Sequence, residues 1–278
     1  PLSRVMVASL GDGSIPTEWV VMGQWVGITS CACVVTMALA RIVLPILVPQ
    51  GWASMLACKP YHVTPVCKNV SEWVPATLVP ILVWKDLVEL TAMAYANLGE
   101  SMLLTAPIGI WRAAGAIFGY MLFDSILMVA WRHDFMRSNG VEMYWLLVMH
   151  HFLSILVWPL SLHYRLGVVL VSWFLFSEAS NIMLAGRTVL GKVQHAGSKT
   201  HLAFGFLFLI LFFVTRIMPI PFLAGVLALG EVRDRPLLIV ILAYTTCPLP
   251  LLLNLYWFIL GIRGAIKTLR PSKDGKGS

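Results

Sequence analysis

The stretch YWLLVMHHFLSILVWPL, from Tyr144 to Leu160, is apolar apart from two adjacent histidines, His150 and His151, and one serine, Ser154. A helix needs ~20 mostly apolar residues to cross the hydrocarbon core of a bilayer. The stretch therefore predicts a membrane-spanning helix that carries two ionisable side chains in its middle.

The whole chain has the composition of a membrane protein. Of its 278 residues, 59% are hydrophobic and only 12% are charged, and the mean hydropathy is +0.82. Soluble domains carry about 25% charged residues. Seven apolar runs are predicted to span the bilayer, at residues 19–43, 75–98, 108–131, 143–160, 166–185, 202–225 and 237–262. We therefore expect an all-α, polytopic transmembrane bundle of about seven spans.

Charged residues and prolines interrupt three of these runs. Lys85, Asp86 and Glu89 lie within the second run, which an interfacial or re-entrant helix would also explain. Lys85 and Glu89 are four residues apart, so we expect them to pair on one helix face. The sixth run contains the prolines of MPIP, residues 218–221, and the seventh those of PLP, residues 248–250. Proline removes a backbone donor, so we expect breaks in both helices.

The basic residues predict an orientation. The side that holds loops 44–74, 132–142 and 186–201 and the C-terminal tail carries twelve Lys and Arg residues, against five on the other side. Cytoplasmic loops are enriched in these residues, so we expect the C-terminus on the cytoplasmic side or its equivalent. Cys58 and Cys67 would then face a reducing compartment, which disfavours a disulfide. No basic face is interleaved with exposed aromatic residues, so no nucleic-acid partner is expected.

Several further polar groups lie inside the apolar runs. An ionisable side chain at the bilayer centre costs at least ~2.5 kcal/mol, so such groups normally face a bundle interior. We expect one cavity with a polar floor, which would contain the following residues: Asp124, Ser154, Glu178, Arg216, Asn254 and Tyr256. Arg216 is expected either to pair with Glu178 or to extend towards the membrane surface.

The two histidines cannot both point at that cavity. Adjacent residues are about 100° apart around a helix, so one histidine should face the cavity and the other a neighbouring helix. The pair has three interpretations: a metal site, which His-His adjacency disfavours; catalytic groups oriented by Asp124 or Glu178; or hydrogen-bonding groups that fix packing or bind a ligand. The five cysteines fit no zinc spacing, and neither a metal nor a cofactor is expected.

Five short motifs, in this order, resemble those of the TLC-domain family, which contains the ceramide synthases and the translocating-chain-associated membrane proteins. They are GYMLFD (119–124), MHHFLS (149–154), SEASNIMLAGR (177–187), RIMPIP (216–221) and PLLLNLYWF (250–258). The resemblance implies a barrel-like bundle of about six helices around a lipid-accessible cavity, with one extra helix in front. It divides the chain into an N-terminal segment (1–74), a TLC-like domain (75–267) and a basic tail (268–278).

The resemblance also bears on activity. In ceramide synthases, paired histidines matching His150 and His151 form the acyl-transfer site with a second His-Asp pair. Ser154 here takes the place of a threonine, and the second motif reads Ser177-Glu178-Ala179-Ser180-Asn181, without that histidine. The pattern resembles family members linked to membrane lipid composition and sensing. A histidine that such members carry in the second span is also missing from KDLVELTAMAY, residues 85–95.

Three functions remain open at this point. The first is a multi-pass protein that binds, senses or handles lipid in an intramembrane cavity, with membrane lipids as its partners and the endoplasmic reticulum or another endomembrane as its location. The second is an acyltransferase that uses acyl-CoA, with His150 and His151 as catalytic groups. The third is an accessory subunit of a larger membrane complex, in an organellar membrane, or a homo-oligomer.

Overall fold

The computed structural model describes residues 15–193, 197–232 and 235–269. Its regular elements in these ranges are all helices, which confirms the predicted all-α class. The first elements are α2 (Thr17–Leu47), α3 (Pro49–Cys58), η1 (Pro60–His62), α4 (Val63–Ser71), α5 (Trp73–Ala96), η2 (Ser101–Leu103), α6 (Ile108–Ala130), α7 (Arg132–Asn139) and α8 (Val141–His163). They are followed by α9 (Val168–Phe176), η3 (Ser177–Ser180), α10 (Asn181–Val193), α11 (Lys199–Phe212), η4 (Phe213–Ile217), α12 (Ile220–Leu229), α13 (Leu237–Thr246) and α14 (Pro248–Leu269).

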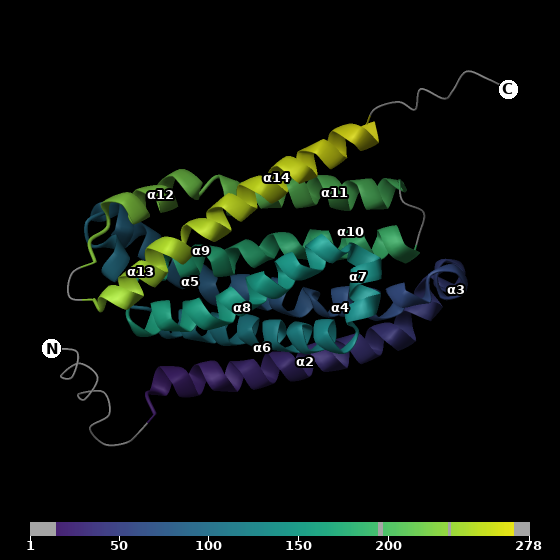
Figure 1. Cartoon of the computed structure of the whole chain (residues 1–278), viewed down its shortest axis with the longest axis horizontal. Coiled ribbons are helices and arrows are strands. Elements are labelled where there is room, and N and C mark those ends of the chain that lie inside the picture. Colours follow the sequence, from purple (N-terminus) through teal and green to yellow (C-terminus); the bar gives the residue numbers. More distant parts are fainter. Residues whose placement is uncertain (1–14, 194–196, 233–234, 270–278) are drawn as a thin grey trace.

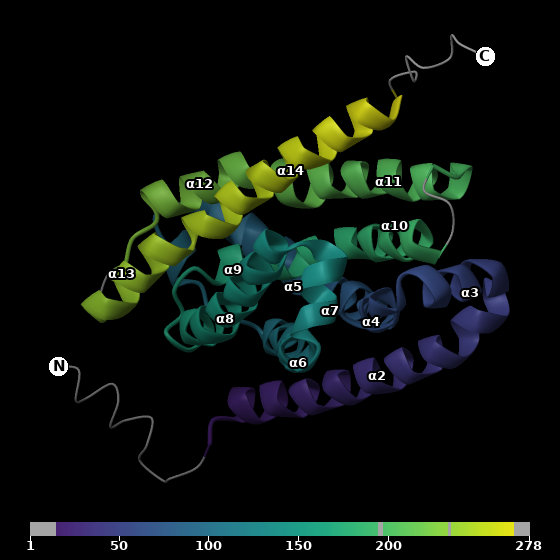
Figure 2. The same ribbon diagram turned by 45° about the vertical axis from the view of Figure 1, so that its right-hand side comes forward.

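The long helices run side by side along the longest axis of the molecule (Figure 1). Helix α2 begins at one end of this bundle, and α14 ends at the other. Figure 2 shows α2 along one outer side, with α11, α12 and α14 along the opposite side. Helices α5, α6, α8 and α9 lie between these two sides, so the centre of the bundle is built from the middle of the chain.

Six helical segments are long and apolar enough to cross a membrane, counted over the described residues. They are Thr17–Leu47, Ile108–Ala130, Val141–His163, Val168–Val193, Lys199–Leu229 and Leu237–Ile266. Each overlaps one of the predicted spans, and the protein is an integral membrane protein. The remaining prediction, residues 75–98, corresponds to α5, which carries the charged residues noted above and is not among the six.

Helix α5 is a central helix of the bundle with one charged outer face. Val79, Val83 and Leu87 are almost completely buried, on a helix that packs against α6 and α9. Lys85 and Glu89 point outward and form the predicted i, i+4 pair, with 4.0 Å between Nζ and Oε1. The charges that interrupt the apolar run therefore leave the buried face intact.

A small-residue motif brings α2 and α6 together. Gly115 and Gly119 of α6 lie against the backbone carbonyls of Met22 and Val26, and a Cβ atom at either glycine would collide with them. The hydroxyl of Ser30 donates to the carbonyl of Gly119 over 2.9 Å. Glycines four residues apart allow such close backbone approach in membrane helices. This contact fixes the first helix on the outside of the bundle.

The predicted loop 44–74 is largely helical, which corrects the sequence-based interpretation. Helices α3 and α4 lie within it, and they pack with the ends of α2 and α10 around a second apolar cluster that includes Trp52, Val66 and Val193. Lys68, one of the basic residues of this predicted loop, is only 6% exposed. The reason is that Val63, Val66, Cys67 and Val70 follow helical spacing and place α4 against the bundle.

Both proline pairs lie at breaks between helical elements. Before Pro219, the backbone forms a π-helical turn, Phe213–Ile217, and the amide of Met218 donates to the carbonyl of Phe213 over 2.8 Å. The predicted break follows this turn at Met218 and Pro219, and α12 begins at Ile220. A π-helical turn of this kind often occurs at functional sites. At the second pair the helix also breaks: α13 ends at Thr246 and α14 begins at Pro248, with Cys247 between them.

Candidate functional site

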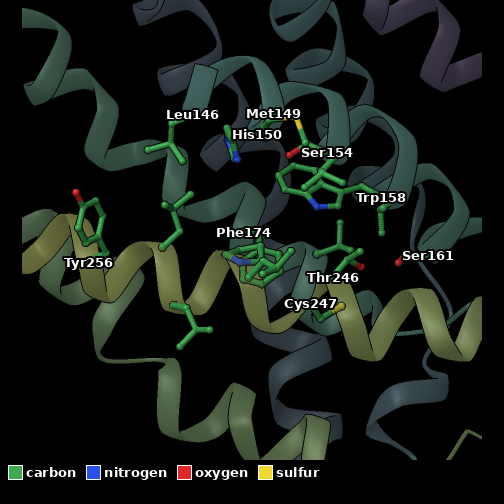
Figure 3. Close-up of a pocket in the computed structure, with 17 residues that line it drawn as sticks. Leu146, Met149, His150, Ser154, Trp158, Ser161, Phe174, Thr246, Cys247 and Tyr256 are labelled. Atoms are coloured by element: carbon green, nitrogen blue, oxygen red, sulfur yellow. The ribbon is translucent and has the colours of Figure 1, made fainter. Parts of the chain in front are cut away.

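An elongated cavity of about 390 Å³ lies between α8, α9 and the α13–α14 junction. Its wall is mostly apolar, with an imidazole, hydroxyls and a thiol at intervals (Figure 3). The lining residues are Leu146, Met149, His150, Leu153, Ser154, Val157, Trp158, Ser161, Val171, Phe174, Thr246, Cys247, Leu249, Pro250, Leu252, Leu253 and Tyr256. The volume falls in the range of ~300–1,000 Å³ that is usual for small-molecule sites.

The cavity is long and open at its side. Its lining extends along α8 from Leu146 to Ser161, a distance of about 22 Å at a rise of ~1.5 Å per residue. Three lining side chains, Met149, Leu252 and Tyr256, are each more than half exposed. They lie on membrane-spanning segments, so the side of the cavity faces the lipid. A hydrocarbon chain could enter it from the bilayer without crossing water.

The two histidines of α8 have different surroundings. His150 lines the cavity, with the rings of His151 and Trp257 at 5.7 and 6.2 Å between centroids. His151 is 4% exposed and does not line the cavity. Its Nε2 lies 3.7 Å from Oδ2 of Asp124 on α6, and its Nδ1 is 3.4 Å from the hydroxyl of Ser125. One histidine thus faces the cavity and the other a neighbouring helix, as predicted.

Asp124 is the centre of the first buried ion cluster. Its Oδ2 lies 3.1 Å from Nζ of Lys68 on α4 and accepts a hydrogen bond of 3.5 Å from the hydroxyl of Tyr120. Lys68 also lies 4.0 Å from a carboxylate oxygen of Glu72. The side chains of Lys68 and Asp124 are 8% and 1% exposed. A buried charge needs a partner of opposite sign, so this cluster joins α4, α6 and α8.

Arg216 is the centre of the second buried ion cluster. It pairs with Glu178 at 3.8 Å, which decides between the two alternatives for this arginine. Its Nε donates to the hydroxyl of Ser180 over 3.0 Å, and its Nη2 to Oδ1 of Asn181 over 3.1 Å. Its Nη1 donates to Oδ1 of Asn254 on α14 over 3.3 Å. The guanidinium therefore joins the π-helical turn η4 to η3, α10 and α14.

The structure divides the predicted polar floor into three groups. His150, Ser154 and Tyr256 line the cavity. Asp124 and His151 belong to the first ion cluster, and Glu178, Arg216 and Asn254 belong to the second. None of these last five is among the residues that line the cavity in the described part of the chain. The expectation of one shared floor is therefore replaced by a cavity with separate ion clusters behind its walls.

Four members of the first cluster were not found from the sequence: Lys68, Glu72, Tyr120 and Ser125. The helical spacing of the valines around Lys68 was the available signal, since a lysine on a buried helix requires an acidic partner. Tyr120 lies four residues before Asp124, on the same face of α6. Ser125 gave no signal, because a serine in an apolar helix can also bond its own backbone.

No group of three or more His, Cys, Asp or Glu side chains in the described ranges is close enough to hold a metal ion. All five cysteines are free: Cys33, Cys67 and Cys247 are buried, and Cys31 and Cys58 are exposed.

In a comparison with protein families, residues 79–263 match the model of the TLC domain. This range is well over half of the chain and contains the cavity and Arg216 cluster. The chain belongs to the TLC-domain family. No curated protein and no solved structure matches this TLC-domain chain. The match begins after α2, α3 and α4, so Lys68 lies outside the matched range, whereas its partner Asp124 lies inside it.

Proposed function

We propose that this TLC-domain protein binds the hydrocarbon chain of a membrane lipid in the cavity between α8, α9 and α14. The observation that carries the proposal is the shape and lining of this cavity: it is apolar, elongated and open towards the bilayer. Each buried CH₂ group contributes about 0.8 kcal/mol relative to water, but far less relative to lipid. Affinity would therefore depend on close packing against Trp158 and Phe174, whose rings stack at 6.2 Å.

The polar groups of the cavity suit a lipid with a polar group near its chain. His150, Ser154 and Tyr256 lie towards the Leu146 end of the lining, and Ser161 and Thr246 lie further along it (Figure 3). A carboxyl, amide or hydroxyl group next to an acyl chain would find hydrogen-bond partners at either place. We propose an endomembrane such as the endoplasmic reticulum as the location, with the C-terminus on the cytoplasmic side, because the basic loops and tail share that side.

The geometry favours binding over acyl transfer. A histidine that acts as a general base is usually oriented by a second group, such as a carboxylate. Here the carboxylate of Asp124 lies beside His151, which does not line the cavity, whereas the cavity histidine is His150. Incubation of the purified protein with acyl-CoA and amine or alcohol acceptors tests this preference. Turnover, or an acylated histidine detected by mass spectrometry, would favour the acyltransferase alternative.

Filling the cavity tests the proposal directly. Val157 lines the cavity and is 7% exposed, so Val157→Trp would occupy space that a chain requires. Phe152→Trp is the matched control, because Phe152 lies on the same helix but is 59% exposed and does not line the cavity. Both proteins would be extracted gently, and their bound lipid would be measured by mass spectrometry.

We expect the Val157→Trp protein to lose its tightly bound lipid and the control to retain it. Overpacking destabilises a protein by about 1–3 kcal/mol, so folding of both variants would be checked by circular dichroism. Equal lipid content in the two folded variants would rule out this cavity as the binding site. Purification of the untreated protein in a stoichiometric complex would instead favour the accessory-subunit alternative.

A further inference from the structure

A second cavity, of about 690 Å³, lies at the end of the bundle where α3 meets α10 and the start of α11. It shares no lining residue with the lipid cavity. Its polar lining consists of Gln50, Ser54, Lys59, Lys192 and Ser198, together with the thiol of Cys58. Two of its described lining residues are lysines and none is acidic. Its chemistry is therefore that of a site for an anion.

The ammonium group of Lys192 is held in place by neutral atoms. Its Nζ donates to the hydroxyl of Ser138 over 2.6 Å and to Oδ1 of Asn139 over 3.1 Å, both at the end of α7. These oxygens orient the side chain without cancelling its charge. An ammonium has three donors, so these two hydrogen bonds, counted over the described residues, leave one N–H for a ligand.

The positive field of the two lysines overlaps at His62. Its Nδ1 is hydrogen-bonded to the same hydroxyl of Ser138, at 2.8 Å. Burial, together with the positive charges of Lys192 and Lys59, lowers the pKa of His62 to about 4. His62 is consequently neutral at neutral pH, and the positive charge here comes from the lysines.

The backbone adds to this field. Helix α3 begins at Pro49, and its first turn lines the cavity at Pro49, Gln50 and Gly51. The first amides of a helix have no intrahelical acceptor, and the N-terminus carries a partial positive charge. Gly51 lies directly against the carbonyl of Val193, where a Cβ atom would collide, so α3 and α10 form one continuous wall.

We propose that this cavity binds a phosphate group between Lys59 and Lys192, carried by an anionic lipid headgroup or by a soluble phosphate compound. Phosphate offers several acceptor oxygens to the two ammonium groups and to the hydroxyls of Ser54 and Ser198. Helix α3, which lines the cavity, lies at the same end of the bundle as α7 and the end of α14 (Figure 1). This is the side predicted to be cytoplasmic, where anionic lipids concentrate in cells.

Binding would be measured on the full-length protein with two probes. In phosphatidylcholine nanodiscs, inorganic phosphate is titrated by calorimetry. In nanodiscs of phosphatidylcholine with phosphatidic acid, the retained lipid is counted by native mass spectrometry. The variants are Lys59→Gln, which changes an exposed side chain, and the double variant Lys59→Gln/Lys192→Gln. Arg263→Gln is the control, because Arg263 is an exposed residue of α14 that does not line the cavity, and its replacement also removes one positive charge.

We expect the Lys59 variant to weaken binding about tenfold, the size expected for one lost charge-assisted hydrogen bond. The double variant should lose binding, and the Arg263 control should retain it. Retention of phosphatidic acid without binding of inorganic phosphate would assign the phosphate to a lipid headgroup, and binding of both would extend the site to soluble phosphates. Unchanged binding in the folded Lys59 and double variants, or an equal loss in the control, would overturn the proposal. The lipid cavity is untouched by these changes, so its own test stands apart.

Discussion

Two faces of α8 have different surroundings, although the residues that form them are neighbours in the sequence. One face, with His150 and Ser154, borders an apolar cavity that is open to lipid. The other, with His151, meets Asp124 and Ser125 of α6 in a closed ionic cluster. His150 and His151 are chain neighbours, but a rotation of about 100° places them in different surroundings.

The difference indicates a division of roles within the bundle. The ion clusters join helices: Lys68 connects α4 to α6, and Arg216 connects η4 to α14. The described residues that line the cavity make no such ionic contacts, and most of them are aliphatic, aromatic or hydroxyl side chains. We infer that the ionic groups position the walls and that the cavity face contacts the ligand.

The largest expected effect comes from Asp124. Asp124→Ala would leave Lys68 buried without its closest partner, which lies 3.1 Å away. Removal of one member of a buried pair destabilises by about 3–5 kcal/mol. We therefore expect a lower free energy of unfolding by that amount, measured by denaturant titration in detergent micelles. The triple variant Lys68→Met/Glu72→Gln/Asp124→Leu should regain most of the loss, because it also neutralises Glu72, the second carboxylate beside Lys68, and so leaves none of these three charges unpaired. A single variant as stable as the parent would show that the cluster does not join the helices.

The second largest effect is expected from replacing the two histidines one at a time. His151→Ala removes the imidazole beside Asp124 and should lower the free energy of unfolding by about 1–3 kcal/mol, the penalty for an unsatisfied buried group. His150→Ala should change stability less and reduce the lipid bound in the cavity. Thermal unfolding and lipid mass spectrometry on both variants would separate the two roles. Identical changes in both quantities would contradict the division between the faces.

The smallest effect concerns α14, where two neighbouring residues again face the cavity and an ion cluster respectively. Leu253 lines the cavity, whereas its neighbour Asn254 accepts a hydrogen bond from Arg216. Asn254→Ala should destabilise by about 0.5–1.5 kcal/mol, because Arg216 keeps its other partners. Tyr256→Phe, on the exposed cavity rim of the same helix, should leave stability unchanged. A larger loss of stability for Tyr256→Phe than for Asn254→Ala would reverse the assigned roles.

Much of the fold could be predicted from the sequence because bilayer thickness imposes a simple rule. Runs of about 20 apolar residues predict membrane-spanning helices, and each predicted span corresponds to a helical segment of the structure. Residue spacing also predicted the Lys85–Glu89 pair and the separation of the two histidines. These are local properties, which depend only on the helix period.

The partners across helices depended on the tertiary structure. The sequence indicated that Asp124, Glu178 and Arg216 face the interior, but it joined them in one floor. The structure assigns Asp124 to Lys68, on a helix that was interpreted as a loop. It also places Arg216 within hydrogen-bonding distance of Asn254, which lies 38 positions later in the sequence. Such pairings follow from helix order and rotation, and hydropathy carries no information about either.

By itself, then, the sequence determined that the chain is a membrane-spanning helical protein with polar groups inside it. The reason is that the length of an apolar run and the helical period depend only on residues that are close together in the sequence. Only the tertiary structure decided that His150 borders a cavity and His151 an ion cluster, and that Lys59 and Lys192 share a second cavity. The physical reason is that a cavity is bounded by side chains from several helices, so its position depends on how those helices pack.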